Sequence, residues 1–291
     1  MNADKLFGYF EARCDPRPLA LFRILFYGGL AVHFGPSLIW TEENFSSTAF
    51  RTNQWNRWLY NAFESLSPNV VLILAVLTGV AVLVGILGLH ARGAAIATAL
   101  GLYTFTSFNA LNLQTLALGL AWALLWLWAL AGTGDEVWAL KVNKAARNKL
   151  ATSAPMLCRA LIVLQLQLGL FFAGIEKITA GWPMTNEMHV LLSYPGGFIL
   201  RPWVANQPFF EYQWVGMALT VLTLVVELGI PILFLFKKTR LPAVAAYQLF
   251  FLGIVAMLQV PPLFYAVYAG CGILVLSDAE TRRFFGPIRA T

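Results

Sequence analysis

Eight apolar runs dominate this sequence and restrict what the chain can fold into. A helix needs about 20 mostly apolar residues to cross a bilayer. The eight runs cover residues 18–39, 69–89, 93–111, 113–131, 155–176, 214–236, 241–259 and 261–276. Only 12% of the residues are charged, about half the share of a water-soluble domain. The sequence therefore predicts an all-α integral membrane protein. We expect a bundle of about eight transmembrane helices with outer interfacial helices or loops, forming a single domain over 1–291 with no appended soluble domain.

Two pairs of runs have weak boundaries. The third and fourth runs are nearly continuous, and Asn109, Asn112 and Gln114 mark the expected turn between them. Pro261 and Pro262 separate the last two runs, because proline disfavours helix at the residue before it and tolerates a new helix start. The eighth run is short, so a re-entrant segment is the alternative there.

The positions of the Lys and Arg residues predict the orientation. With eight spans, fourteen of the twenty fall on one side of the membrane and four on the other, and Arg23 and Arg159 fall within spans. The fourteen are Lys5, Arg13, Arg17, Arg92, Lys141, Lys144, Arg147, Lys149, Lys237, Lys238, Arg240, Arg282, Arg283 and Arg289. Cytoplasmic loops carry the excess of positive charge. We therefore expect the protein in a plasma (bacterial inner) membrane with both termini in the cytoplasm.

Two long segments fall on the opposite side in this topology, at 40–68 and 177–213. Both are rich in Trp, Tyr and Phe, which favour the headgroup layer of a bilayer. We expect them to lie at the outer membrane interface, partly as amphipathic helices.

Several other functions have no support in the sequence. The three cysteines, Cys14, Cys158 and Cys271, have neither metal-site nor disulfide spacing. The polar N-terminus lacks the apolar stretch of a signal peptide, and the chain has no nucleotide-binding, zinc-protease or serine-hydrolase motif. The net charge of +6 is explained by topology, so we expect no metal, nucleotide or nucleic acid.

Two charged residues fall inside predicted spans, where ionisable groups are costly and often functional. Arg23 lies near the cytoplasmic end of the first span and can either snorkel to the interface or pair with another group. Glu227 lies in the middle of the sixth span, so it must be protonated, paired or hydrated. The simplest structural arrangement is a buried Arg23–Glu227 pair.

Lys177 is the most informative polar residue. It follows the fifth span, and Gly174 and Ala173 share its face of the helix. These small residues leave a groove where a ligand or another helix can approach. A partly desolvated lysine has a lowered pKa and can act as a base, whereas the structural alternative is a snorkelling lysine beside helix-packing residues.

Other polar and aromatic groups fall at the same membrane face. His33, Asn112, Gln114 and Trp182 are all on the outer side in this topology. We predict that they line, with Gly174, an outward-opening substrate or cofactor pocket around Lys177. His189 lies in the same outer segment, and a single histidine is more often structural.

Two segments resemble a known family. CDPRPLALFRILFYGGL resembles the opening of vitamin K-dependent gamma-glutamyl carboxylase and its bacterial relatives, the HTTM (horizontally transferred transmembrane) proteins. FFAGIEKITAGW resembles a second element of that family, with Ala173, Gly174, Lys177 and Trp182 at the matching positions. The segment around Glu227 is a weaker third match.

The resemblance implies a function for Lys177. In the carboxylase, the lysine of the second element is the proposed base that deprotonates reduced vitamin K. The product reacts with oxygen, and the strong base so formed takes a proton from a substrate glutamate. The resemblance thus implies a carboxylase-like or oxidoreductase-like enzyme that uses a quinone on the non-cytoplasmic side, with Lys177 as the catalytic base.

The chain departs from the carboxylase pattern in several places. The carboxylase continues into a large soluble lumenal region, and its catalytic histidine near the hairpin between the third and fourth spans has no counterpart here, with Gln114 near that place. A non-enzymatic partner for export or maturation of a secreted peptide, acting with a genetically linked membrane protein, is therefore the alternative. A small transporter is a weaker third reading, because the spans contain few charges.

Overall fold

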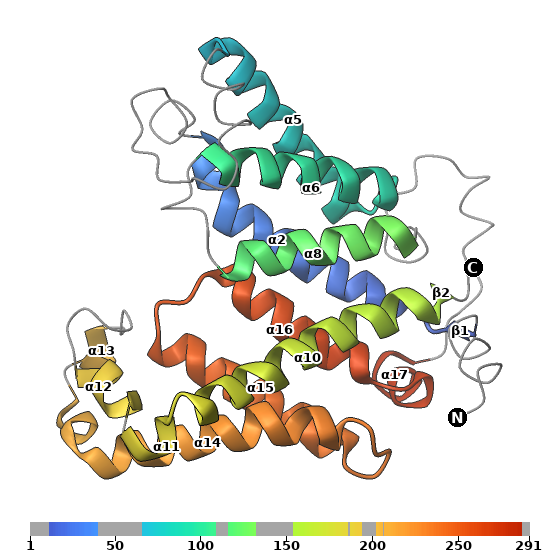
Figure 1. Ribbon diagram of the computed structural model, residues 1–291. Coiled ribbons are helices and arrows are strands. Elements are labelled where there is room, and N and C mark those ends of the chain that lie inside the picture. Colours follow the sequence, from blue (N-terminus) through green and yellow to red (C-terminus); the bar gives the residue numbers. More distant parts are fainter. Residues whose placement is uncertain are drawn as a thin grey trace. The chain divides into compact units, whose positions relative to one another are not determined.

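The structure is a computed structural model and is almost entirely helical (Figure 1). It describes residues 12–39, 66–108, 116–131, 154–185, 187–193, 202–205 and 207–286. Within these ranges the only strands are β1 (Arg13–Cys14) and β2 (Ala154–Pro155), which pair antiparallel. Apart from this two-residue bridge, the described part of the chain has the predicted all-α class.

A helix is found in each of the eight predicted ranges. These helices are α2 (Arg17–Ile39), α5 (Pro68–Leu87), α6 (Ala91–Phe108), α8 (Leu116–Ala131), α10 (Met156–Thr179), α14 (Gln213–Leu233), α15 (Arg240–Met257) and α16 (Pro262–Val275). Among the described residues, α2, α5, α10, α14 and α15 are long and apolar enough to cross a membrane. A sixth candidate is α16 followed by α17 (Asp278–Phe285), a helix pair bent by 108°. Length and composition thus support five to six spans, and the count of eight stays a prediction.

Local chemistry sets several of these boundaries. Helix α5 begins with proline, which has no N–H to leave unpaired at the first position. It ends at Gly88, whose φ of 71° is the left-handed conformation that glycine adopts without steric cost. The predicted break between the last two runs is confirmed, because α15 ends at Met257 and α16 begins at Pro262.

The predicted interfacial segments are partly described. Residues 40–65 lie outside the described residues. The segment 177–213 contains, after the end of α10, the short helices α11 (Trp182–Thr185), α12 (Glu187–Ser193) and α13 (Pro202–Ala205) and the 3-10 helix η1 (Pro208–Glu211). Helices are therefore present in this segment as expected, and their place at the membrane interface stays a prediction.

The chain forms two compact units. Unit 1 comprises Met1–Leu161, Pro262–Val267 and Asp278–Thr291, and unit 2 comprises Ile162–Pro261 and Tyr268–Ser277. The prediction of a single domain over 1–291 stays a prediction.

Unit 1 is built by successive helix packing, α2 on α5, α5 on α6 and α6 on α8. Its core contains Trp128, whose ring lies 5.7–6.1 Å from the rings of Phe22, Phe26 and Tyr27. Close packing depends on Gly85, because any Cβ there would overlap the Tyr27 ring.

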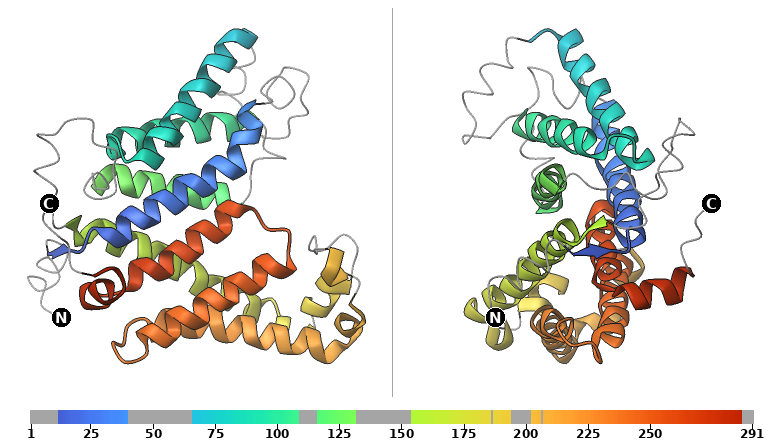
Figure 2. Two further views of the ribbon diagram at one scale, coloured as in Figure 1. Left: turned by 180° about the vertical axis from the view of Figure 1, so that it is seen from behind. Right: turned by 90° about the vertical axis from the view of Figure 1, so that its right-hand side faces the viewer.

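Unit 2 is organised around α14, which contacts α11, α12, η1 and α15, and α14 and α15 lie side by side in both figures (Figures 1 and 2). A small apolar core joins the short helices to the start of α14, with Leu192, Val204, Phe210 and Val215 buried in it. Gly216 allows the approach of α12, because a Cβ there would overlap His189.

Candidate functional site

A charged pair joins α10 to α14 inside unit 2. Lys177 Nζ donates hydrogen bonds to both carboxylate oxygens of Glu227, at 2.6 and 2.8 Å. The Lys177 side chain is 20% exposed and the Glu227 side chain 9%. Charge-assisted hydrogen bonds of this length are strong, and removing one partner would leave the other charge largely buried. The two residues therefore behave as one electrostatic unit.

Glu227 lies well inside α14. It comes 14 positions after Gln213, where α14 begins, and six positions before Leu233, where α14 ends, which is about 21 and about 9 Å along a helix axis at 1.5 Å per residue. Lys177 lies two positions before Thr179, where α10 ends. The C-terminal end of α10 thus meets the interior of α14. This places the ammonium beside an apolar helix, where charge is costly.

Gly174 makes this close crossing possible. A Cβ at Gly174 would lie 2.8 Å from Leu228 Cδ2 and 3.1 Å from Glu227 Cβ. The space beside Gly174, where the sequence predicts a groove next to Lys177, is therefore filled by α14. Of the two alternatives, ligand or helix, a helix lies there.

The structure brings one further predicted pocket residue to Lys177. The centre of the Trp182 ring lies 5.3 Å from Lys177 Nζ, a distance at which the ring face attracts a cation. His33 belongs to α2 in unit 1, and its Nε2 is buried with no hydrogen-bond partner in the described part of the chain. Asn112 and Gln114 lie outside the described residues. The outward-opening pocket as a whole stays a prediction.

Arg23 is fully buried in unit 1. Its guanidinium lies against Gly88, where any added Cβ would overlap it. The partner that the structure gives Glu227 is Lys177, which sequence reasoning missed. The Arg23–Glu227 pairing stays a prediction that this geometry does not support.

Unit 2 also contains a buried polar group that sequence reasoning did not single out. Gln167 Nε2 in α10 donates to Cys271 Sγ in α16 at 3.3 Å. Tyr247 in α15 is fully buried, and its hydroxyl has no hydrogen-bond partner among the described residues. The signal available in the sequence was a glutamine inside an apolar run, which is costly unless paired.

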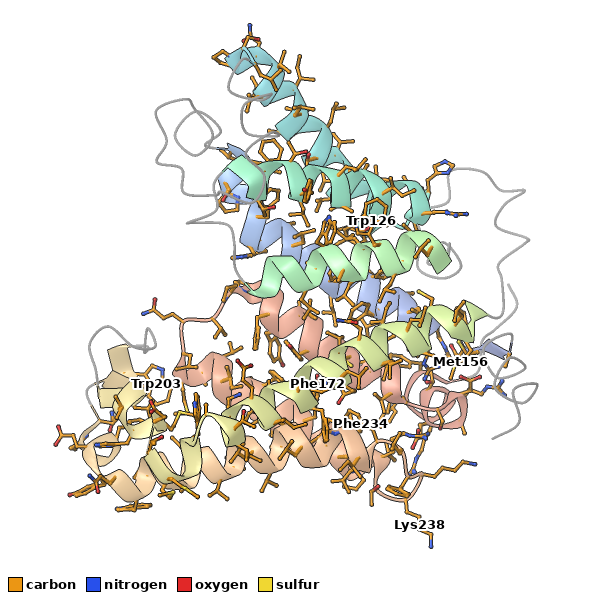
Figure 3. All side chains as sticks on the ribbon, in the orientation of Figure 1. Trp126, Met156, Phe172, Trp203, Phe234 and Lys238 are labelled. Carbon is orange, nitrogen blue, oxygen red and sulfur yellow. The ribbon has the colours of Figure 1, made fainter. Side chains whose placement is uncertain are left out.

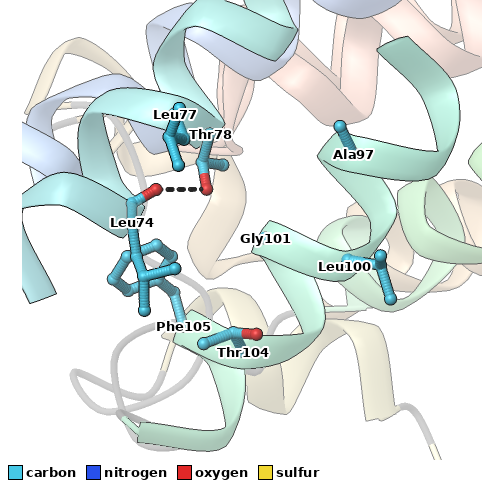
Figure 4. Close-up of a pocket in the computed structure, with 8 residues that line it drawn as sticks. All are labelled: Leu74, Leu77, Thr78, Ala97, Leu100, Gly101, Thr104 and Phe105. Atoms are coloured by element: carbon cyan, nitrogen blue, oxygen red, sulfur yellow. Dashed lines mark hydrogen bonds between the residues drawn. The ribbon is translucent and has the colours of Figure 1, made fainter. Parts of the chain in front are cut away.

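A pocket of about 180 Å³ lies between α5 and α6 in unit 1 (Figure 4). It is lined mostly by apolar side chains, and no titratable group lines it. The Thr78 hydroxyl donates to the Leu74 carbonyl at 2.8 Å and so does not offer its proton to a ligand. The lining side chains Leu77 and Leu100 are 59% and 53% exposed. The lining therefore provides no acid or base for proton transfer.

A second charged cluster lies at the start of α2 in unit 1. The Arg17 guanidinium donates to both Asp15 carboxylate oxygens, with Nη2–Oδ2 at 2.6 Å and Nε–Oδ1 at 2.9 Å. Burial raises the pKa of Asp15, but the hydrogen bonds from Arg17 lower it more, so the pKa lies below its ordinary value. This pair is therefore charged at neutral pH.

The same cluster holds α17 in place. Asp278 Oδ1 accepts a hydrogen bond from the Asp15 backbone N–H at 3.0 Å and one from Arg159 Nη1 at 3.3 Å. Neighbouring Cys14 is buried and free, and burial raises its pKa above the ordinary value. Such a thiol is a poor nucleophile, so we interpret this cluster as structural. No group of three His, Cys, Asp or Glu side chains in the described residues could hold a metal ion.

The outer faces of the helices identify the class of protein. Large apolar side chains point away from the core in both units (Figure 3). Examples are Phe172 at 60% exposed, Leu83 at 57% and Leu235 at 75%. Exposed apolar surface of this extent is typical of contact with lipid. With several candidate spans, the chain is a helical integral membrane protein, and it contains a charged pair within its apolar helices.

The comparison with protein families then gives the particular family. The model of the HTTM domain matches residues 12–275, which is most of the chain and includes both Asp15 and Lys177. The protein therefore belongs to the HTTM family. No curated protein and no solved structure matches the chain.

Proposed function

We propose that this HTTM protein is a membrane enzyme that modifies its substrate by proton abstraction, with Lys177 as the base. The observation that carries the proposal is the Lys177–Glu227 pair at the interior of α14. Ionisable groups at such positions are functional candidates by default.

Glu227 gives Lys177 a way to become a base. In a poorly hydrated site, the ammonium can transfer a proton to the carboxylate through the hydrogen bond that joins Nζ and Oε1 at 2.6 Å, which leaves a neutral amine and a neutral acid. The amine then accepts a proton from the substrate, and the pair as a whole gains one positive charge. Glu227 is the positioning residue in this scheme, because it holds the amine and takes its proton.

The residues present fit a quinone-type cofactor. A quinone ring has polar oxygens for the ammonium and an aromatic face for Trp182, whose ring lies 5.3 Å from Nζ. When bound in its reduced form, such a cofactor would supply an acidic hydroxyl and two reducing equivalents. The family resemblance, through Lys177 and Trp182, supports the same cofactor class.

The test measures quinol-dependent oxygen consumption by the protein in lipid nanodiscs, with a short-chain naphthoquinol as the probe. Variants are compared at equal amounts of folded protein. We expect Lys177→Ala and Glu227→Gln to abolish the activity. Lys177→Arg should fail as well, because a guanidinium does not lose its proton. Lys238→Ala, at an exposed turn, serves as the control and should remain active.

We further propose that the termini are cytoplasmic and that the modified substrate is on the other side of an inner membrane. The support is the fourteen-to-four distribution of Lys and Arg and the positive-inside rule. Reporter fusions after Thr291 and near residue 46 should report opposite compartments.

The second candidate is a non-enzymatic membrane partner for a secreted peptide or a linked membrane protein. It is favoured by one observation, that Lys177 engages both carboxylate oxygens of Glu227. A pair satisfied in this way can simply join α10 to α14. If this candidate is right, the double variant Lys177→Met with Glu227→Leu keeps its binding to the partner. Under the enzyme proposal, the same variant loses its quinol-dependent oxygen consumption.

A further inference from the structure

Helix α17 is fixed at both ends by residues of unit 1. At its start, Asp278 accepts hydrogen bonds from the Asp15 backbone and from Arg159. At its end, Arg17 Nη1 donates to the carbonyls of Phe285 at 3.2 Å and Gly286 at 2.6 Å. The last carbonyls of a helix have no partner within it, and here an arginine side chain supplies one. An eight-residue helix is thereby held in one orientation.

That orientation leaves one face of α17 uncovered. Thr281 is fully buried, whereas Arg282 and Arg283 are exposed and Phe284 is 63% exposed. The exposed face thus combines two cations with a large apolar ring, and Glu280, which precedes Arg283 by three positions and Phe284 by four, adds a partly exposed carboxylate to the same side. Helices with this combination bind at the boundary between lipid headgroups and acyl chains.

The direction of α17 fits this position. The helix turns by 108° from α16, with which it forms a candidate span, and Figure 2 shows α17 leaving the line of α16. Helix α17 therefore runs nearly perpendicular to α16.

We propose that the exposed face of α17, formed by Arg282, Arg283 and Phe284, is a binding site for the headgroups of anionic phospholipids. The two guanidinium groups match the phosphate of a headgroup, which they can bind through paired hydrogen bonds. The Phe284 ring enters the acyl boundary beside them. The opposite charges of site and lipid select an anionic surface over a zwitterionic one.

The test measures lipid binding by native mass spectrometry on the full-length protein in neutral detergent. The probes are phosphatidylglycerol and, for comparison, phosphatidylcholine. Removing one charge near an anionic surface weakens binding about fivefold. The variant Arg282→Gln with Arg283→Gln should therefore lose about 25-fold in phosphatidylglycerol affinity, with little change for phosphatidylcholine. Lys substitutions at both positions keep the charges but lose the paired hydrogen bonds, so this variant should bind phosphatidylglycerol more tightly than the Gln variant and more weakly than the wild type.

The control variant removes the same charge elsewhere, with Arg92→Gln and Lys238→Gln at two separate exposed positions. It should keep the wild-type affinity. An equal loss in this variant would show that total charge binds the lipid, and the proposed site would be wrong.

Phe284→Ser tests the nature of the ligand. We expect it to weaken phosphatidylglycerol binding severalfold, because an apolar contact with the acyl boundary is lost. Full retention in this variant would overturn the membrane site and favour a soluble anion or an acidic peptide instead. Wild-type phosphatidylglycerol affinity in the double Gln variant would also overturn the proposal.

Discussion

The two charged clusters of this protein use ion pairs in different ways. In unit 1, Asp15 and Arg17 are two residues apart, and their remaining hydrogen-bonding capacity is used by Asp278 and by backbone carbonyls. In unit 2, Lys177 and Glu227 are 50 residues apart in sequence and bond to each other across two helices. The first cluster lies at the start of α2, and the second lies at the interior of α14.

This difference bears on the chemical role that we propose for the pair in unit 2. The Asp15–Arg17 cluster fastens three segments of chain with several strong bonds, and a proton transfer would break them. Among the described residues, Lys177 and Glu227 hydrogen-bond to each other, and an exchange of the proton between them keeps the contact. A charged pair of this kind among apolar helices is therefore the better candidate for the proposed proton transfer.

The largest effect is expected from breaking the pair in unit 2. Lys177→Ala or Glu227→Gln alone should lower the free energy of unfolding by about 3–5 kcal/mol, because each leaves a buried group without its partner. The double variant Lys177→Met with Glu227→Leu should lower the free energy of unfolding by less than the two single variants added together. Chemical denaturation in detergent micelles measures this, and two silent single variants would show that the pair does not stabilise the fold.

Arg17→Gln tests the cluster in unit 1. Hydrogen bonds to charged groups contribute about 1.5–3 kcal/mol each, so we expect a loss of that order. The loss should be local, with α17 becoming accessible to proteases and to hydrogen exchange before the rest of the chain. Arg283→Gln, which changes an exposed side chain of α17, is the matched control. Unchanged protection of α17 in Arg17→Gln would show that the cluster does not hold this helix.

Gly174→Ala sharpens the comparison by moving the two helices of unit 2 apart. The added Cβ would press on Leu228 and Glu227, and overpacking of this kind costs about 1–3 kcal/mol. Gly169→Ala on the same helix has open space around its Cβ and should stabilise α10 by up to about 1 kcal/mol. Thermal unfolding of both variants measures the difference, and equal melting temperatures would contradict the close crossing at Gly174.

The smallest effect is a pH dependence confined to unit 1. The pKa of Asp15 is lower in the folded protein than its ordinary value because Arg17 bonds to the carboxylate. Its contribution to stability is therefore complete above the ordinary pKa near 4. It is lost as the pH falls through the lower folded value. The protection factors of the α17 amides, which correct for the pH dependence of intrinsic exchange, should be lower at pH 3 than at pH 6, and Asp15→Asn should remove most of this difference.

Much of the fold could be predicted from the sequence because apolar runs and prolines act locally. The eight ranges each contain a helix, and the break before Pro262 lies where the two prolines predicted it. The family could be predicted too, because the segments around Asp15 and Lys177 carry enough identity to be recognised. Lys177, Gly174 and Trp182 could be grouped for the same local reason, since they lie within nine residues of chain, and the pocket that they are expected to line stays a prediction.

The partner of Glu227 could not be predicted in this way. The sequence placed Glu227 well inside the sixth apolar run, as the structure does. Depth alone made Arg23 a reasonable partner. The sequence contains no direct signal for how two helices cross, which depends on side-chain packing along both of them. The pocket between α5 and α6 was missed for the same reason.

The sequence by itself thus determined the lipid environment, the helices and the family, because each depends on composition or on residues close together in the chain. Only the tertiary structure decided that the end of α10 meets the interior of α14 and that Arg17 holds the end of α17. Both contacts join residues far apart in sequence. They depend on the steric fit of packed segments. The missing Cβ of Gly174 lets α10 approach α14 closely, and the length of the Arg17 side chain lets it reach the end of α17.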